Sequence, residues 1–443
     1  MSAHQPQPAT GGALRAPLLF AALIVLFIFE GFSSGWNSAL GLLNMGLISA
    51  IMALGLNLQW GYAGLFNAGT MGFIALGGLA PVLVSMPATP GAMQAGGWRI
   101  MGALALAAVA LFIAIWLYQR LRKGIRGAAL LAWLVAAFFL FRWVFDPGVA
   151  AVEAINPSAQ GYLGGLGLPI LLSWPVGALF AAAAAWAIGK IALGLRSDYL
   201  AIATLGIAEI IVAVLKNENW LDRGVMNVNG LPRPFFIPRE IDLQADAAFI
   251  DVSTKLGIDP VTASTVLVKL LYLGLFVVVI AALLWATERA LHSPWGRMMR
   301  AIRENEIAAS AMGKNVTRRH LQIFILGSAI CGLAGAMLIT LDGQMTPSSY
   351  NPLRYTFVIM VMVIAGGSGN NWGAVLGGVL IWYLWIKAES WGPGLMQLAT
   401  AGLDNGVLRA HILESAAQMR YLAMGVILLL VLRFAPRGLL PER

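Results

Sequence analysis

Residues 199–216 read YLAIATLGIAEIIVAVLK, eighteen residues in which only Glu209 and Lys216 carry charge. An α-helix needs an apolar run of this length to cross the hydrocarbon core of a bilayer, which is about 30 Å thick. The whole chain has the same character, since 59% of its 443 residues are hydrophobic and only 11% are charged. We therefore predict an all-α, polytopic membrane helix bundle.

Eleven other segments have a similarly apolar composition and are separated by polar stretches. The first of them follows Arg15 as the core of a secretory signal would, but no Ala-x-Ala cleavage pattern comes after it, so we expect an uncleaved span. We expect a single transmembrane domain over residues 1–443 with about 10–12 transmembrane segments. The candidate spans are residues 17–35, 39–58, 65–86, 99–119, 127–145, 170–195, 199–215, 264–287, 321–342, 355–366, 372–388 and 417–434.

Basic residues divide unequally between the two sides that alternating spans define. One side receives residues 120–126, 289–319 and 433–443, with Arg15 and Arg196, and these hold sixteen lysines and arginines. Cytoplasmic loops carry the excess of positive charge, so we predict that both chain ends are cytoplasmic and that the net charge of +9 reflects orientation rather than a nucleic-acid partner. The opposite side holds seven basic residues, namely Lys216, Arg223, Arg233, Arg239, Lys255, Arg354 and Arg409.

Two glycine-rich stretches interrupt the apolar pattern. They are GYAGLFNAGTMGFIALGG, residues 61–78, and AGGSGNNWGAVLGG, residues 365–378. Interrupted backbone at membrane depth is tolerated where it is buried in protein or lines a watery cavity, so these stretches favour interrupted or re-entrant helices of a transport pathway. The alternative is that the glycines only let helices pack closely, as the G-x-x-x-G spacing of Gly373 and Gly377 would.

Polar residues near these stretches and in the spans are candidates for the translocation pathway. Glu209 lies near the middle of its span, where an ionisable side chain is costly. It would either line the pathway, pair with a charge on a neighbouring helix, or make a structural hydrogen bond inside the bundle. The candidate pathway residues are Asn57, Asn67, Thr204, Glu209, Ser368 and Asn370.

Motifs of hydrolytic catalysis are absent from the sequence. The Gly-Lys pairs at residues 189–190 and 313–314 lack the earlier glycine and the following hydroxyl of a phosphate-binding loop, so any ATP hydrolysis requires another subunit. One cysteine, Cys331, and four well-separated histidines give no metal-ligand spacing. We therefore expect no enzymatic activity, catalytic residue, metal or cofactor in this chain.

The most charged stretch is RENEIAASAMGKNVTRRH, residues 303–320. We predict one short amphipathic helix over residues 297–312, a left-handed cap at Gly313 and a return into the membrane, which together make a cytoplasmic knob. Small alanines favour protein docking over the alternative of a helix lying on lipid headgroups. The predicted apolar stripe consists of Met298, Ala301, Ile302, Asn305, Ala308, Ala309 and Met312.

The longest polar segment, residues 216–263, falls on the opposite side. Its proline, glycine and balanced charges predict an ordered extracytoplasmic loop with short helices, which would be a docking surface for a partner.

Residues 300–337, RAIRENEIAASAMGKNVTRRHLQIFILGSAICGLAGAM, resemble the cytoplasmic loop of ABC-importer permeases, in which a Glu-Ala-Ala run precedes a glycine. The chain is similar, more narrowly, to the LivM-type branched-chain amino acid permeases. The same resemblance is carried by ALGLNLQWGYAGLFNAGTMGFIALG at 53–77, SDYLAIATLGIAEII at 197–211, VMVIAGGSGNNWGAVLGGVL at 361–380 and the ending RFAPRGLLPER. An extra pair of spans near residues 99–145 departs from that family.

The resemblance implies a permease of the bacterial inner membrane that moves branched-chain or other neutral amino acids. Its implied partners are a second homologous permease, two cytoplasmic ATPase subunits and a periplasmic solute-binding protein. Residues 216–263 would then be periplasmic, and residues 288–320 would form the ATPase-coupling loop. The candidate coupling residues are Arg303, Glu306, Ala308, Ala309 and Gly313.

Other functions stay open at this point. A permease of the same superfamily that carries urea or short amides would have a similar lining. An ion-coupled secondary transporter would normally show several acidic or histidine residues deep in its spans, and here Glu209 stands almost by itself. A membrane enzyme or scaffold is the least favoured, because the sequence offers no catalytic set.

Overall fold

The computed structural model describes residues 12–157, 160–401 and 407–442. The terminal residues 1–11 and 443 lie outside the described residues. The predicted cytoplasmic location of both chain ends therefore concerns residues that the structure does not describe. The described part is mainly helical, which confirms the all-α membrane bundle. The one addition is a two-stranded antiparallel sheet in which Val228 pairs with Met345 and Asn229 with Gln344.

Helices account for every predicted span. The long helices are α1 (Gly12–Ser34), α2 (Trp36–Asn57), α3 (Thr70–Ser85), α4 (Trp98–Arg120), α5 (Lys123–Glu153), α6 (Ile170–Ala192), α7 (Ser197–Asn217), α11 (Pro260–His292), α14 (Val316–Asp342), α16 (Asn371–Ala399) and α18 (Met419–Phe434). The shorter elements are α8 (Asn219–Asp222), β1 (Val228–Asn229), α9 (Glu240–Ala245), α10 (Ala247–Lys255), α12 (Pro294–Glu304), α13 (Glu306–Ala311), β2 (Gln344–Met345), α15 (Val358–Gly366) and α17 (Val407–Glu414).

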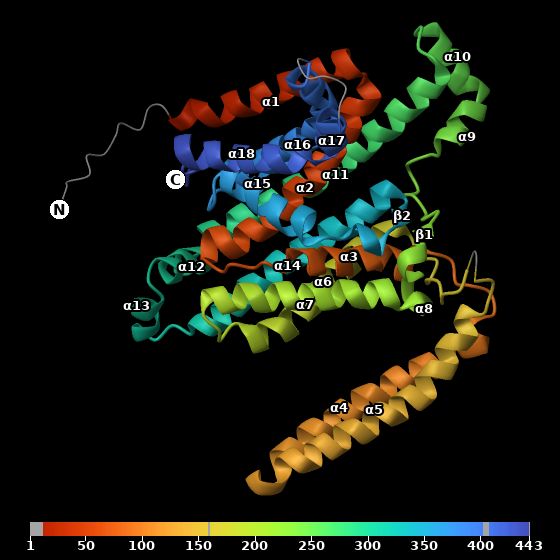
Figure 1. Ribbon diagram of the computed structural model, residues 1–443, viewed down its shortest axis with the longest axis vertical. Helices are drawn as coiled ribbons and strands as arrows, with labels where there is room; N and C mark the ends of the chain where they lie inside the picture. The colour runs from red at the N-terminus through yellow and green to blue at the C-terminus, as the bar shows by residue number, and fades with distance from the viewer. Residues whose placement is uncertain (1–11, 158–159, 402–406, 443) are drawn as a thin grey trace, which may run out of the picture.

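The bundle has two distinct ends (Figure 1). Helices α12 and α13 lie at one end, which we call the knob end, and α8 with the β1–β2 sheet lies at the other, which we call the sheet end. Helix α14 packs against α2, α3 and α6 between these ends, and α3 packs against α6, so these helices form the core. Among the described residues, eight helices are long and apolar enough to cross a membrane, and the segments Thr70–Ser85 and Leu353–Gly366 are shorter apolar helices.

Glycines let the core helices approach each other closely. A Cβ built on Gly77 of α3 would lie 1.9 Å from the carbonyl oxygen of Gly332 on α14, and one on Gly335 would lie 2.0 Å from the carbonyl oxygen of Ile74. Only residues without a Cβ permit such contact. The packing interpretation of Gly377 is confirmed in the same way, since its Cβ would meet the carbonyl oxygen of Met362 on α15 at 2.0 Å.

Both predicted interruptions are present. Helix α2 ends in a π-helical turn, Leu58–Tyr62, and residues 64–69 are not helical before α3 begins. A second π-helical turn, Leu353–Phe357, opens the short helix α15, and residues 367–370 separate α15 from α16. The two interruptions lie 300 residues apart in sequence, and their side chains meet in space, as the site below shows.

Helices α4 and α5 form a hairpin that leaves the bundle. Figure 1 shows it attached at the sheet end and diverging from α7 along its length. Its base is a small apolar cluster, in which Ile100 and Val152 pack with Trp220 of α8. These helices confirm the extra pair of spans.

The loop of residues 216–263 is ordered, as predicted. It contains α8, β1, α9 and α10 and lies at the sheet end. Within this loop, Arg233 forms an ion pair with Glu240 of α9, with 2.7 Å between the charged atoms.

The prediction of one amphipathic helix over residues 297–312 is wrong. The backbone is extended at Asn305, which ends α12 and caps α13 by accepting a hydrogen bond from the Ala308 N–H at 2.9 Å. An asparagine side chain competes for backbone donors in this way and favours a cap over a helix interior. The predicted stripe is correspondingly broken, because Ile302 and Ala309 are buried whereas Asn305 and Met312 are exposed.

Candidate functional site

The two interruptions meet at a junction of buried amides. Asn57, at the end of α2, accepts a hydrogen bond from the Gly369 N–H at 2.9 Å and donates one to the Asn371 side-chain oxygen at 3.3 Å. Both asparagines are fully buried. A buried amide is stable only when its donors and acceptors are matched, so this pair fixes the end of α2 against the start of α16.

Gln59 holds the π-helical turn against α14. Its side-chain N–H groups donate to the Phe324 carbonyl and to the Ser328 hydroxyl, both at 2.9 Å, and its oxygen accepts from Asn67 at 2.7 Å. These partners lie on separate stretches of the chain. The turn is therefore tied to a core helix and to the non-helical residues that follow it.

Hydroxyl groups satisfy the backbone that the interruption frees. The Thr204 hydroxyl of α7 accepts from the Ala68 N–H at 3.1 Å, and the Thr356 hydroxyl accepts from the Met71 N–H at 3.3 Å. Non-helical backbone in a membrane needs such partners inside the protein. The start of α3 thus depends on side chains from two other elements.

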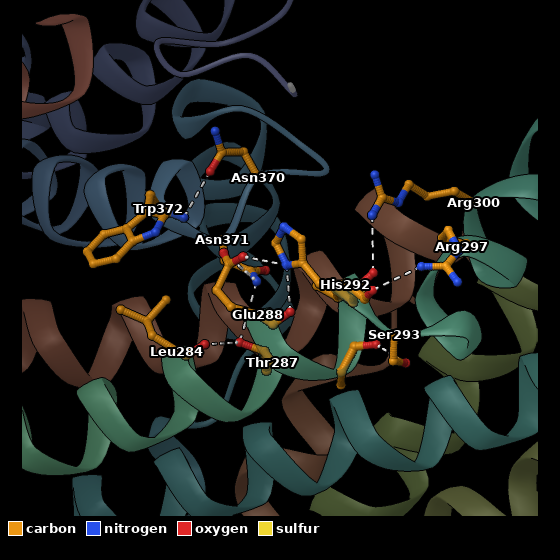
Figure 2. A network of polar contacts seen from close by, with 12 residues as sticks. Leu284, Thr287, Glu288, His292, Ser293, Arg297, Arg300, Asn370, Asn371 and Trp372 are labelled. Carbon is orange, nitrogen blue, oxygen red and sulfur yellow. Dashed lines mark hydrogen bonds and ion pairs between the residues drawn. The ribbon is translucent and has the colours of Figure 1, made fainter. Parts of the chain in front are cut away.

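Asn371 extends the junction toward α11 (Figure 2). Its side-chain nitrogen donates to the Thr287 hydroxyl at 3.4 Å and to a Glu288 carboxylate oxygen at 3.1 Å. His292 lies one turn beyond Glu288 and contacts it, and an open surface pocket of about 510 Å³ borders the pair. Asn370 caps α16 by accepting from the Trp372 and Gly373 N–H groups.

Arg303 connects the knob to the junction. It lies on α12, donates to the Gly61 carbonyl in the π-helical turn, and pairs with Glu442 at 2.7 Å. The Glu442 carboxylate lies over Gly369, where a Cβ would come within 2.9 Å of it. A Cβ on Gly369 would also lie 3.1 Å from the Arg303 Nη1 atom, so one guanidinium bonds to the first interruption and lies directly beside the second.

The end of the described chain is itself built into the second interruption. The N–H groups of Leu439 and Leu440 donate to the carbonyls of Ala365 and Gly366, both at 2.8 Å. The Asn370 side chain donates to the Pro441 carbonyl at 3.2 Å. These bonds satisfy carbonyls that the end of α15 leaves free.

The knob presents an apolar tip. Ile307 is 84% exposed and Met312 is 72% exposed, while Ala309 packs inward. Gly313 has a φ of 76°, which confirms the left-handed cap after the helix. Glu306 and Ala308 are exposed beside the tip.

The structure separates the predicted pathway residues into two groups. Asn57, Asn67 and Thr204 belong to the junction network, and Asn370 caps α16 beside it. Ser368 is exposed at the second interruption, and Glu209 is exposed on the opposite face of α7 from Thr204. No group of His, Cys, Asp or Glu in the described part of the chain is arranged to hold a metal ion.

Sequence reasoning missed several polar residues of the bundle. Glu30 of α1 pairs with Lys387 of α16 and accepts a hydrogen bond from Tyr383 at 3.1 Å. Asn371 and Glu442 were also missed, although the first sits in the quoted glycine-rich stretch. A charged residue near the end of an apolar run would have been the signal for Glu30, but its partner is more than 350 residues away.

One titratable group at the sheet end has a markedly shifted pKa. Burial raises the pKa of the Asp222 carboxyl to about 7, although the Gly224 N–H, which donates to it at 3.1 Å, acts in the opposite direction. The residue belongs to α8, which also supplies Trp220 to the base of the hairpin.

An apolar helical bundle with paired helix interruptions and an external knob defines a multi-pass membrane protein of the permease class. The family described as "Branched-chain amino acid transport system / permease component" matches residues 127–432. The match covers more than half of the chain, so the chain belongs to this family.

Curated relatives agree with the family. The high-affinity branched-chain amino acid transport system permease protein LivM of Escherichia coli is 28% identical over 297 residues, 66% of this chain and 62% of LivM. The probable LivM of Methanocaldococcus jannaschii is 30% identical over 35% of this chain and 42% of its own. The fructose import permease protein FrcC of Rhizobium meliloti is 30% identical over 24% of this chain and 29% of its own. The match thus spans about three fifths of LivM's length, and no solved structure matches.

Proposed function

We propose that this chain is the permease subunit of an ATP-binding-cassette importer that moves branched-chain or other neutral amino acids into the cytoplasm. Its proposed partners are a second homologous permease, two cytoplasmic ATPase subunits and a periplasmic solute-binding protein. The LivM relatives are named as subunits of a branched-chain amino acid transport system, and this supports the proposal. ATP hydrolysis would belong to the partners.

The orientation follows from charge. We propose that the knob end faces the cytoplasm of the bacterial inner membrane, because it carries α12, α13 and the arginines around them. The sheet end, with residues 216–263, would then face the periplasm and receive the solute-binding protein.

The contact of Arg303 with Gly61 and Glu442 carries the mechanistic part of the proposal. Closure of the ATPase subunits would move the knob, residues 294–313, and Arg303 would transmit that movement to both interruptions. Packed cores switch between discrete arrangements and do not deform continuously, so a displacement of the junction would move α2 and α16 as rigid bodies. The resulting cycle is alternating access.

The roles of the polar residues follow from this arrangement. Asn57, Asn67 and Thr204 would hold the interrupted segments that border the pathway, and Ser368 with Asn370 would lie at its cytoplasmic end. Glu306, Ala308, Ala309 and Gly313 would shape the surface on which an ATPase docks.

A matched pair of glycine variants tests the docking role of the knob. Gly313 and Gly230 both have a φ of 76° with open space around a built Cβ, so valine imposes the same backbone strain at both. We expect Gly313→Val to remove ATPase co-purification and ATP-dependent leucine uptake, while Gly230→Val, at the sheet end, retains ATPase association. Equal association of the two variants with the ATPase would contradict the proposal.

Uptake competition in cells that express the whole complex identifies the substrate class. We expect unlabelled leucine and valine to compete with labelled leucine, and urea and glutamate not to compete. Transport by this chain alone in vesicles with an ion gradient and no ATP would instead indicate a secondary transporter.

A further inference from the structure

Glu209 lies in the interior of a long apolar helix and has no side-chain partner among the residues that the structure describes. It lies about 18 Å along α7 from Ser197 and about 12 Å from Asn217, which places it within the hydrocarbon core. Its side chain is exposed, and no hydrogen bond or ion pair joins it to any residue that the structure describes. Glu30, by contrast, is buried and pairs with Lys387.

Lipid cannot supply the partner that an ionisable side chain requires at this depth. The rest of the exposed face of α7 also allows a protein helix to approach. Gly206 lies one turn from Glu209 and has nothing within 4 Å of a built Cβ, and Ala213 lies one turn further along. Small residues on either side of a polar side chain are typical of helix contacts in membranes.

The α4–α5 hairpin shows what a lipid-facing surface of this chain looks like. Its exposed side chains include the bulky apolar groups of Phe112, Ile115 and Phe139, and residues 100–119 contain no charged residue. Arginines near its tip stack on aromatic rings, with Arg120 over Trp116 and Arg126 over Tyr118, which is typical of a membrane interface. The face of α7 differs because it carries a carboxylate, Glu209, in the interior of the helix, with the small residues Gly206 and Ala213 on either side of it.

We propose that the exposed face of α7, formed by Ile202, Gly206, Glu209, Ile210 and Ala213, is the surface that binds the second permease subunit. The occupant is a membrane helix of that subunit that places a basic or hydroxyl donor against Glu209. This inference rests on the proposed function, because only a permease that works as a pair has such a partner. It goes further by assigning the face and the chemistry of the contact.

Photo-crosslinking in the intact complex tests the assigned face. A benzoyl-phenylalanine at Ile210, which is 63% exposed, is compared with one at Leu131 of the hairpin, which is 66% exposed. We expect the Ile210 probe to form an adduct with a chain that matches the same permease family, and the Leu131 probe to form it at least about tenfold less. An adduct of the Ile210 probe with lipid alone, or with a second copy of this chain, would overturn the proposal.

Substitutions of Glu209 test the contact itself. We expect Glu209→Leu to lower co-purification of the second permease about tenfold, and Glu209→Gln, which still forms hydrogen bonds, to lower it less than about threefold. Because the residue is exposed, both variants should elute as monodisperse protein in detergent. Full co-purification of Glu209→Leu with loss of leucine uptake would assign Glu209 to substrate binding and overturn the proposal.

Uptake by the wild-type complex is measured in the same cells. Uptake without an Ile210 adduct would refute this inference and leave the proposed function standing. Absence of both uptake and ATPase association would refute the proposed function. Whether the exposed face of α7 binds the second permease is decided by the Ile210 adduct alone.

Discussion

Helix α2 and the α4–α5 hairpin are both apolar enough to cross a membrane, yet they occupy opposite environments. The most apolar stretch of the α2 segment is 78% buried inside the protein, whereas that of α5 is 0% buried. Apolar composition is needed in either place, since lipid tails and a protein core exclude water alike. The difference lies in the amides Asn44 and Asn57, which α2 buries against neighbouring elements, and in how the glycines pack. A Cβ on Gly55 of α2 would lie 2.7 Å from Cys331 on α14, whereas one on Gly102 of the hairpin would meet nothing within 4 Å.

The largest expected effect comes from replacing a glycine of the packed core, with a glycine of the hairpin as the control. We expect Gly335→Leu to prevent folding, at a cost of more than about 3 kcal/mol, because its Cβ would already lie 2.0 Å from a carbonyl oxygen. We expect Gly102→Leu on the hairpin, where nothing lies within 4 Å, to fold normally. Thermal unfolding in detergent, followed by size-exclusion chromatography, compares the two. Similar destabilisation of both variants would show that the hairpin packs against the bundle.

The base of the hairpin gives a prediction of pH dependence. Asp222 has a pKa of about 7 in the folded protein against 3.8 for a free side chain, so its ionisation opposes folding. The wild type should therefore lose about 3 kcal/mol of stability as the pH rises from about 4 to about 7, and little more above that range. Asp222→Asn keeps the acceptor for Gly224 and should remove this loss. Melting temperatures of both proteins across that range check it, and parallel pH profiles would contradict it.

The smallest expected effect on stability comes from removing either of two ion pairs of similar length, one at the knob and one on the hairpin. Arg303 and Glu442 join distant elements at 2.7 Å, while Arg142 and Asp146 lie one turn apart on α5 at 2.8 Å. Both are partly exposed, so removing either should change stability by less than about 1 kcal/mol.

Their effects on transport should differ. We expect Glu442→Ala to lower leucine uptake severalfold while ATPase activity persists, and Asp146→Ala to leave uptake unchanged. A normal ratio of transport to ATP hydrolysis in Glu442→Ala would show that the C-terminal residues do not transmit the movement.

Much of the architecture could be predicted from local sequence. Apolar length located a helix for each of the twelve predicted spans, glycine-rich stretches located both interruptions, and Gly313 marked the turn of the knob. The apolar periodicity of residues 297–312 predicts a single helix, but the structure has two. Asn305 prefers to cap a helix, and this preference outweighs the periodicity around it. The junction was found only in part, because Asn57 and Asn67 stood out as amides whereas Glu442 gave no signal in a polar C-terminal stretch.

The sequence by itself determined that this chain is a membrane bundle with two interruptions and a charged knob. These features depend on the solvation of local segments, and a segment carries its own hydrophobicity, caps and turns. Only the tertiary structure decided that the interruptions meet at Asn57 and Asn371, that Arg303 joins the knob to them, and that Glu209 faces outward. Those facts depend on which helix faces touch, and in a membrane that choice is made by close packing and hydrogen-bond pairing between residues hundreds of positions apart.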